Sequence, residues 1–236
     1  LQTVLERMGH ETYVLDKPFK LQHLPFWRRL FFYTKQIIKK YILGKPVGVI
    51  GERKRFERDK VERKYTQPFI DKNVKRFLIN NLCDIQQNDF DAFVVGSDQI
   101  WRMLYFKLFW STRNSADAFL EFTDGWNVKR ISFAASFGID VPDILPKELK
   151  SCQIAISKFN AVSVREESGV TACRKYLNRE AKWEMNPTML LTSSDYSKLI
   201  PGEINHKPIL MSYVLDESPK IAALREQIAK SKHLTV

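Results

Sequence analysis

The sequence predicts an α/β fold in which helices cover both faces of a parallel sheet. Two observations indicate this class: short, apolar segments with the composition of buried strands, and longer amphipathic segments that alternate with them. We expect strands at residues 92–95, 129–135, 161–164 and 208–213. We expect helices at residues 146–158, 167–177 and 219–231. Strands and helices that alternate at this spacing are typical of βαβ units, which build parallel sheets.

The first 16 residues read as half of a further α/β unit. Apolar residues recur at helical spacing over residues 1–9, Gly9 is a natural helix stop, and residues 11–16 form a short strand pattern. No capping residue precedes Leu1, so the sequence begins within a helix pattern. Residues 230–236 look like the end of a helix followed by a strand that stops after a few residues. We therefore expect a fragment that is inactive by itself.

Residues 20–85 differ in character and are interpreted as a basic helical insertion. The whole net charge of +11 arises within residues 1–80. Residues 25–43 form an aromatic-rich, basic amphipathic helix, and residues 53–64 a mostly exposed helix or arm. The helix at 25–43 either packs on its own domain or lies on an anionic membrane, where it could hold a lipid-linked acceptor. No nucleic-acid-binding motif accompanies the basic residues, so nucleic acid is not expected as a partner.

Other motifs narrow the function classes. The three cysteines form no CxxC pair, which predicts neither a disulfide framework nor a zinc site and suggests a reducing cytoplasm. None of the four histidines has a nucleophile or acid at motif spacing. Glycine-rich nucleotide loops and HExxH are absent from the sequence, so no cofactor and no metal are expected. No apolar run reaches the length of a membrane span.

Polar residues follow three of the predicted strands at the point where each strand ends. Ligands of parallel sheets bind outside the carboxyl ends of the strands, so these residues should share one rim. They are Ser97, Asp98, Gln99, Ser136, Arg165 and Glu166. Two local alternatives remain open: residues 96–101 could be a simple turn with Trp101 packed on the core, and Arg165 could only pair with a neighbouring glutamate.

Five blocks in order resemble the bacterial polysaccharide pyruvyl transferase family. They are "DAFVVGSDQIW", "AFLEF", "KRISFAASFG", "FNAVSVREESGV" and "NPTMLL", and they cover about residues 91–191. The resemblance implies a GT-B-like arrangement of two Rossmann-like domains. Residues 1–200 would form the first domain and residues 201–236 the start of a truncated second one.

The resemblance also implies an activity. The family transfers pyruvate from phosphoenolpyruvate to a pair of sugar hydroxyls as a ketal, in the assembly of capsular or exopolysaccharides. This implies a saccharide acceptor and phosphoenolpyruvate as the donor. It also implies a cytoplasmic location, either free or peripherally attached to the inner face of the membrane.

Site residues follow from the same resemblance. Arg165 corresponds to a phosphoenolpyruvate contact, Asp98 with Ser97 to cleft-lining groups, and Gln99 and Trp101 to contacts for the acceptor sugar. The family's Arg-x-His segment, which would supply the general acid, does not occur in this chain, so the catalytic acid is unknown. Arg102 and Asn186 depart from the family pattern, which puts the acceptor preference and any ionic role at position 186 in doubt.

Two other functions are weighed against this one. The first is a GT-B-type glycosyltransferase that uses a nucleotide sugar. The second is a non-catalytic module that binds glycans or membranes through its basic N-terminal helix.

Overall fold

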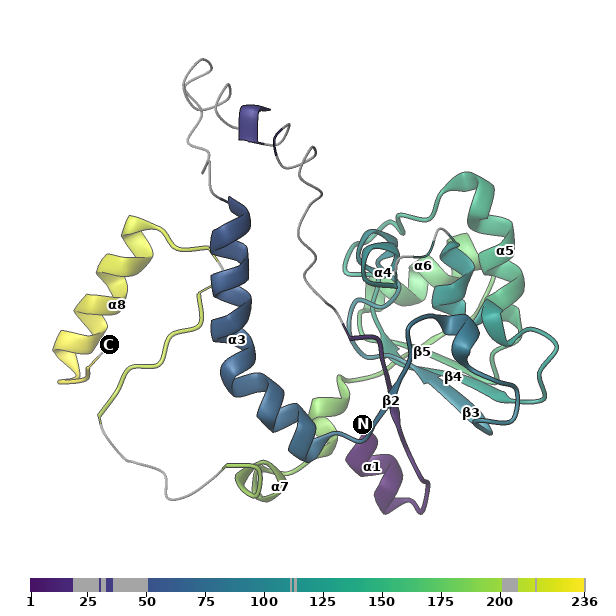
Figure 1. The fold of residues 1–236 in the computed structure, drawn as a ribbon, viewed down its shortest axis with the longest axis horizontal. Coiled ribbons are helices and arrows are strands. Elements are labelled where there is room, and N and C mark those ends of the chain that lie inside the picture. Colours follow the sequence, from purple (N-terminus) through teal and green to yellow (C-terminus); the bar gives the residue numbers. More distant parts are fainter. Residues whose placement is uncertain are drawn as a thin grey trace. The chain divides into compact units, whose positions relative to one another are not determined.

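The computed structural model describes residues 1–18, 30, 33–35, 51–110, 112, 114–200, 208–214 and 216–235 (Figure 1). The predicted amphipathic helix at residues 25–43 lies outside these residues except at positions 30 and 33–35, and so does the membrane contact assigned to it. The chain divides into two compact units, Leu1–Thr192 and Ser193–Val236. The predicted domain boundary after residue 200 stays a prediction.

A four-stranded parallel sheet forms the centre of the first unit. Its strands are β3 (Ala92–Val95), β4 (Lys129–Ala135), β5 (Ala161–Val164) and β6 (Lys182–Trp183), and they lie side by side in that order. The first three coincide with predicted strands. The two-residue β6 was not predicted, because two residues are too few to show a strand pattern.

Helices connect these strands and flank the sheet. They are α4 (Met103–Trp110), α5 (Pro146–Ser157) and α6 (Glu167–Leu177), with 3₁₀ turns η3 (Ser115–Phe119) and η4 (Glu121–Thr123) after α4. Each connection advances by one strand in the same direction, and right-handed crossovers then place the connecting helices over the same face. Figure 1 shows α4, α5 and α6 gathered over the sheet. The predicted α/β class with a parallel sheet flanked by helices is confirmed. The helices α4, α5 and α6 lie over one face, and the expected helices on the other face of this sheet stay a prediction.

A smaller parallel sheet joins the N-terminal residues to residues 76–78, which lie within the predicted helical insertion at 20–85. Helix α1 (Gln2–Arg7) leads to β1 (Val14–Asp16), which pairs with β2 (Arg76–Leu78). Helix α3 (Gly51–Asn73) precedes β2 and contains the predicted charged segment. The side chains of Arg76 and Asp16 form an ion pair at 2.8 Å across the two strands. The strand β2 was not predicted from the sequence.

The second unit contains α7 (Ser193–Ser197) and α8 (Pro219–Ser231). The helix α8 begins as predicted, because the hydroxyl of Ser218 accepts a hydrogen bond from the Ile221 amide at its first turn. The predicted strand at residues 208–213 shows one parallel bridge, between Ile209 and Thr235. Among the helices that the structure describes in either unit, none is both long and apolar enough to cross a membrane.

The burial of two cysteines yields a test of the helix packing over the sheet. Cys152 of α5 and Cys173 of α6 are fully buried, and this burial raises the pKa of both thiols to about 12. Cys83 is exposed. Since the thiolate is the reactive form, only Cys83 should react with a thiol reagent at pH 8 in the native protein. Reaction of two or three thiols without denaturant would contradict the packing of α5 and α6.

Candidate functional site

The loops that follow β3, β4 and β5 converge at the carboxyl edge of the sheet. The amide of Ser136 donates to the carbonyl oxygen of Asp98 at 3.2 Å, and the amide of Trp101 donates to the carbonyl oxygen of Ser136 at 3.1 Å. The amide of Arg165 donates to the carbonyl oxygen of Ala135 at 3.1 Å. Backbone hydrogen bonds thus hold the three predicted strand ends together.

Gly96 permits the close approach of the first two loops. Its φ of +145° is a conformation that residues with a side chain rarely adopt, and a Cβ atom there would lie 2.0 Å from the backbone oxygen of Phe133. Any other residue would force β3 and β4 apart at this edge. Glycine at position 96 is therefore a steric requirement of the site.

The hydroxyl of Ser136 lies at the centre of a polar network. The residue is fully buried. Its Oγ donates to Oε1 of Glu166 at 2.7 Å, and it accepts from Nη2 of Arg165 at 3.2 Å and from the amide of Gly138 at 2.9 Å. Ser136 therefore fixes both charged side chains and the start of the loop at residues 138–140.

Arg165 is held by further contacts but keeps free donors. Its Nε donates to Oε1 of Glu166 at 2.8 Å, and its Nη1 donates to the carbonyl oxygen of Ser97 at 3.1 Å. With the bond to Ser136, three of the five N–H groups of this guanidinium have partners among the described residues. Two N–H groups remain for a ligand, and 27% of the side chain is exposed.

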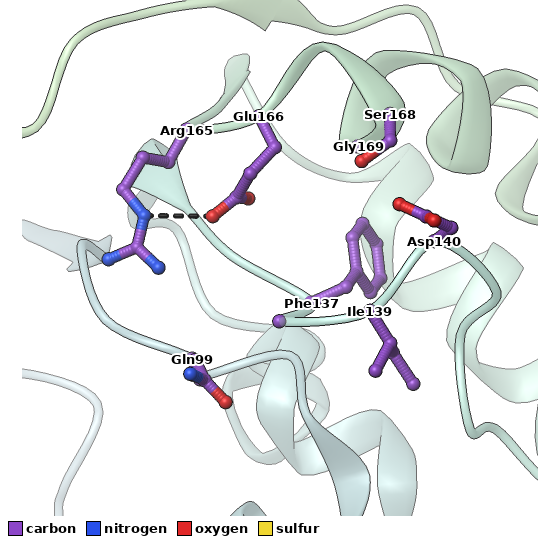
Figure 2. A pocket seen from close by; sticks show the side chains of 9 residues that line it. Gln99, Phe137, Ile139, Asp140, Arg165, Glu166, Ser168 and Gly169 are labelled. Atoms are coloured by element: carbon purple, nitrogen blue, oxygen red, sulfur yellow. Dashed lines mark hydrogen bonds and ion pairs between the residues drawn. The ribbon is translucent and has the colours of Figure 1, made fainter. Parts of the chain in front are cut away.

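A pocket of about 290 Å³ opens beside this network (Figure 2). It is lined by Gln99, Phe137, Gly138, Ile139, Asp140, Arg165, Glu166, Ser168 and Gly169. Its volume is at the lower end of the range for small-molecule sites. The first turn of α6 forms part of the wall, and Glu166, the N-cap residue, makes no capping hydrogen bond there because its carboxylate is directed to Arg165. A helix N-terminus beside a guanidinium favours an anionic group.

The predicted site residues occupy three kinds of position. Gln99, Arg165 and Glu166 line the pocket. Ser136 lies beneath them in the core, and Ser97 contributes its carbonyl oxygen to Arg165. Asp98 is exposed and is not among the lining residues, although its carbonyl oxygen joins the two loops.

The interpretation of Trp101 as a platform for a sugar ring is wrong. Its indole is 0% exposed and lies between the rings of Phe119 and Phe137, with centroid distances of 5.1 and 5.2 Å. Its Nε1 donates to the carbonyl oxygen of Ala118 at 3.1 Å. A fully buried indole has no face to offer a pyranose ring, so the structure supports the alternative in which Trp101 packs in the core.

Several residues near the site were not singled out from the sequence. Ile139 and Asp140 line the pocket from the loop that follows β4. Trp183 of β6 is 62% exposed, and its Nε1 donates to the carbonyl oxygen of Arg165 at 3.0 Å. The only available signal was that residues 138–140 continue the loop that follows a predicted strand.

The two departures from the family pattern have local roles. The Nε of Arg102 lies 3.3 Å from Oδ2 of Asp143, outside the pocket lining. The side chain of Asn186 accepts from the amide of Thr188 at 3.0 Å and caps the 3₁₀ turn η5 (Pro187–Leu190). In the part of the chain that the structure describes, no three His, Cys, Asp or Glu side chains are grouped so that they could hold a metal ion.

Comparison with known proteins agrees with the family resemblance seen in the sequence. A family model described as polysaccharide pyruvyl transferase matches residues 1–232, which is nearly the whole chain. No curated protein and no solved structure matched in the same comparisons.

The burial of Trp101 predicts a large effect on stability. Trp101→Ala should lower the free energy of unfolding by roughly 3–5 kcal/mol, as expected for removal of a buried indole. Trp183→Ala is the matched control, because that indole is largely exposed and should cost much less. Urea denaturation of both variants measures the difference. Equal stability of Trp101→Ala and the wild type would restore the interpretation of Trp101 as a surface contact.

Proposed function

The chain belongs to the polysaccharide pyruvyl transferase family, and from this membership we propose that it transfers pyruvate from phosphoenolpyruvate to two hydroxyl groups of a saccharide. The product is a ketal, and inorganic phosphate is released. The setting that fits this chemistry is the assembly of a bacterial capsular or exopolysaccharide on the cytoplasmic side of the membrane.

The observation that carries the proposal is the pair of free N–H groups on Arg165 at the wall of the pocket. Phosphoenolpyruvate carries a phosphate and a carboxylate, and a guanidinium binds either group through two parallel hydrogen bonds. The first turn of α6 lines the same pocket and adds backbone dipoles that favour an anion. The contacts to Ser97, Ser136 and Glu166 orient the guanidinium before the donor arrives.

Such an arrangement suits a reaction in which charge develops at the donor carbon. Protonation of the methylene carbon creates a cationic centre at C2, and the departing phosphate becomes more negative. A guanidinium that is already oriented stabilises that phosphate without further reorganisation. We assign this role to Arg165.

The acceptor side of the proposal rests on Gln99 together with Asp98 and Ser97. Gln99 lines the pocket and carries an amide that could hydrogen-bond to sugar hydroxyls. A lipid-linked saccharide, with residues 25–43 in contact with an anionic membrane, is the form of acceptor that we propose for this protein. Trp101 has no part in acceptor binding, because it is buried.

The first test measures phosphate release by the full-length protein from phosphoenolpyruvate, with galactose- and mannose-containing oligosaccharides as acceptors. Arg165→Ala should lower the rate roughly 10- to 100-fold, because a hydrogen bond to a charged group contributes about 1.5–3 kcal/mol. The matched control is Arg174→Ala. Arg174 lies on α6 in an exposed ion pair with Glu180, so its loss should leave the rate unchanged. Undiminished phosphate release by Arg165→Ala would remove this residue from the donor site.

The second test separates the donor classes by ligand-induced stabilisation. Phosphoenolpyruvate should raise the Tm of the wild-type protein, because a ligand that binds only the folded state stabilises it. Arg165→Ala should abolish that shift. A rise in Tm with UDP or GDP but none with phosphoenolpyruvate would instead support a nucleotide-sugar glycosyltransferase. Binding of anionic liposomes with no turnover of any donor would support the non-catalytic module.

A further inference from the structure

The two carboxylate oxygens of Glu166 have different surroundings. Oε1 accepts from the hydroxyl of Ser136 at 2.7 Å and from Nε of Arg165 at 2.8 Å. Among the described residues, no hydrogen-bond donor is recorded for Oε2. Figure 2 shows this second oxygen directed away from Arg165, towards the side of the pocket where Asp140 lies. The carboxylate is thus fixed through one oxygen and open through the other.

The position of Glu166 leaves that open oxygen accessible. Glu166 lines the pocket, and 36% of its side chain is exposed. Its neighbour Arg165 supplies the free N–H groups assigned above to the donor. A saccharide hydroxyl that approaches a donor held by Arg165 would therefore come within reach of Glu166.

Ketal formation requires such a group. Each acceptor hydroxyl must lose its proton when its oxygen bonds to C2 of the donor, and a carboxylate within hydrogen-bond reach performs this step as a general base. Inverting glycosidases use a carboxylate in the same way to activate a water molecule. An ionised carboxylate is suited to the task because it only accepts hydrogen bonds.

We propose that Glu166 is the general base that takes the hydroxyl proton of the acceptor saccharide through Oε2, and that Ser136 is the positioning residue that holds its other oxygen. The inference rests on the proposed function. In the step concerned, C2 is cationic because the methylene carbon has been protonated. The acceptor O–H bond breaks and its proton moves to Oε2 of Glu166, while the hydroxyl oxygen donates an electron pair to C2 and forms the new C–O bond. Before the second hydroxyl adds, the bond between C2 and the phosphate oxygen breaks, its electron pair leaves with phosphate, and C2 is cationic again. In the overall reaction one hydroxyl proton is balanced by the proton gained at the methylene carbon, and the other leaves with phosphate.

The other carboxylates near the pocket fit this role less well. Asp140 lines the pocket but is exposed, and no hydrogen bond or ion pair fixes its side chain among the described residues. Asp98 is exposed and is not a lining residue. A catalytic group has to be held within about 0.5 Å of its working geometry by supporting contacts. Glu166 has two such contacts, from Ser136 and Arg165.

The deciding experiment compares turnover with donor binding in the Glu166→Gln variant of the full-length protein. Glutamine keeps an oxygen that can accept from Ser136 and Arg165, but it cannot take a proton. Phosphate release, on an acceptor that the wild-type protein uses, should fall by roughly 10²- to 10⁴-fold, the usual contribution of a general base. The rise in Tm caused by phosphoenolpyruvate should stay as in the wild type. Glu180→Gln, an exposed glutamate paired with Arg174, is the matched control and should keep full turnover.

The positioning role of Ser136 has its own readout. Ser136→Ala should lower kcat while the acceptor KM changes little, because the carboxylate loses orientation but not its place in the pocket. The Tm shift with phosphoenolpyruvate should become smaller but persist, because Arg165 loses its bond to Ser136 and keeps those to Ser97 and Glu166. Ser136→Thr keeps a hydroxyl and should recover part of kcat. Equal kcat in the alanine and wild-type proteins would contradict this role.

Three outcomes would overturn the assignment of Glu166. Turnover of Glu166→Gln within twofold of the wild type would exclude a base at this position. Loss of the phosphoenolpyruvate-induced Tm shift in that variant would make Glu166 a part of donor binding instead. A large loss of turnover in Asp140→Asn, with none in Glu166→Gln, would transfer the role to Asp140. Failure of the wild-type protein to release phosphate from phosphoenolpyruvate is a different result, because it rejects the proposed function itself.

Discussion

The candidate site depends on the buried hydroxyl of Ser136. A hydroxyl without water around it must find partners in the protein, because an unpaired polar group costs free energy when it is buried. Here the partners are the two charged residues that follow β5 and the amide of Gly138. One side chain at the end of β4 thereby sets the orientation of the guanidinium, the carboxylate and the loop that closes the pocket. The neighbouring strand contributes through Gly96, whose missing side chain allows β3 to lie close enough.

The contact between Arg165 and Glu166 contributes more to orientation than to stability. Both side chains are partly exposed, with exposed fractions of 27% and 36%, and ion pairs in such surroundings add about 0–1 kcal/mol. The pairing uses one N–H of Arg165 and one oxygen of Glu166. The bonds to Ser97 and Ser136 use two more N–H groups, which leaves two N–H groups and one carboxylate oxygen. If the two side chains served only to neutralise each other, the remaining N–H groups of Arg165 and the second oxygen of Glu166 would be expected to pair as well. The geometry instead keeps a donor and an acceptor of hydrogen bonds at the same pocket.

Three of the four strands of the central sheet were predictable because their signal is local. Residues 92–95, 129–135 and 161–164 are short, apolar and followed by polar residues, and the structure has strands at these positions. The helix α4 carries apolar residues on all sides, so no periodic pattern revealed it; Met103 is buried whereas Leu108 is exposed. The environment of Trp101 depends on Phe119 and Phe137, which lie far from it in sequence, so local reasoning left its role open. The direction of the Glu166 carboxylate is likewise a tertiary property.

The order of residues at the end of β5 explains how adjacent side chains can serve one pocket. Within a strand, neighbouring side chains point to opposite faces, but Arg165 and Glu166 lie in the bend between β5 and α6, where that alternation ends. The bend is held from both sides. Val164 before it is fully buried, and the Cα of Gly169 after it lies so close that an added Cβ would be 3.1 Å from the Val164 side chain. Ser136, Arg165 and Glu166 all belong to the compact unit Leu1–Thr192. Their mutual geometry is therefore set within that unit, and a movement of the second unit would leave the spacing of the guanidinium and the carboxylate unchanged.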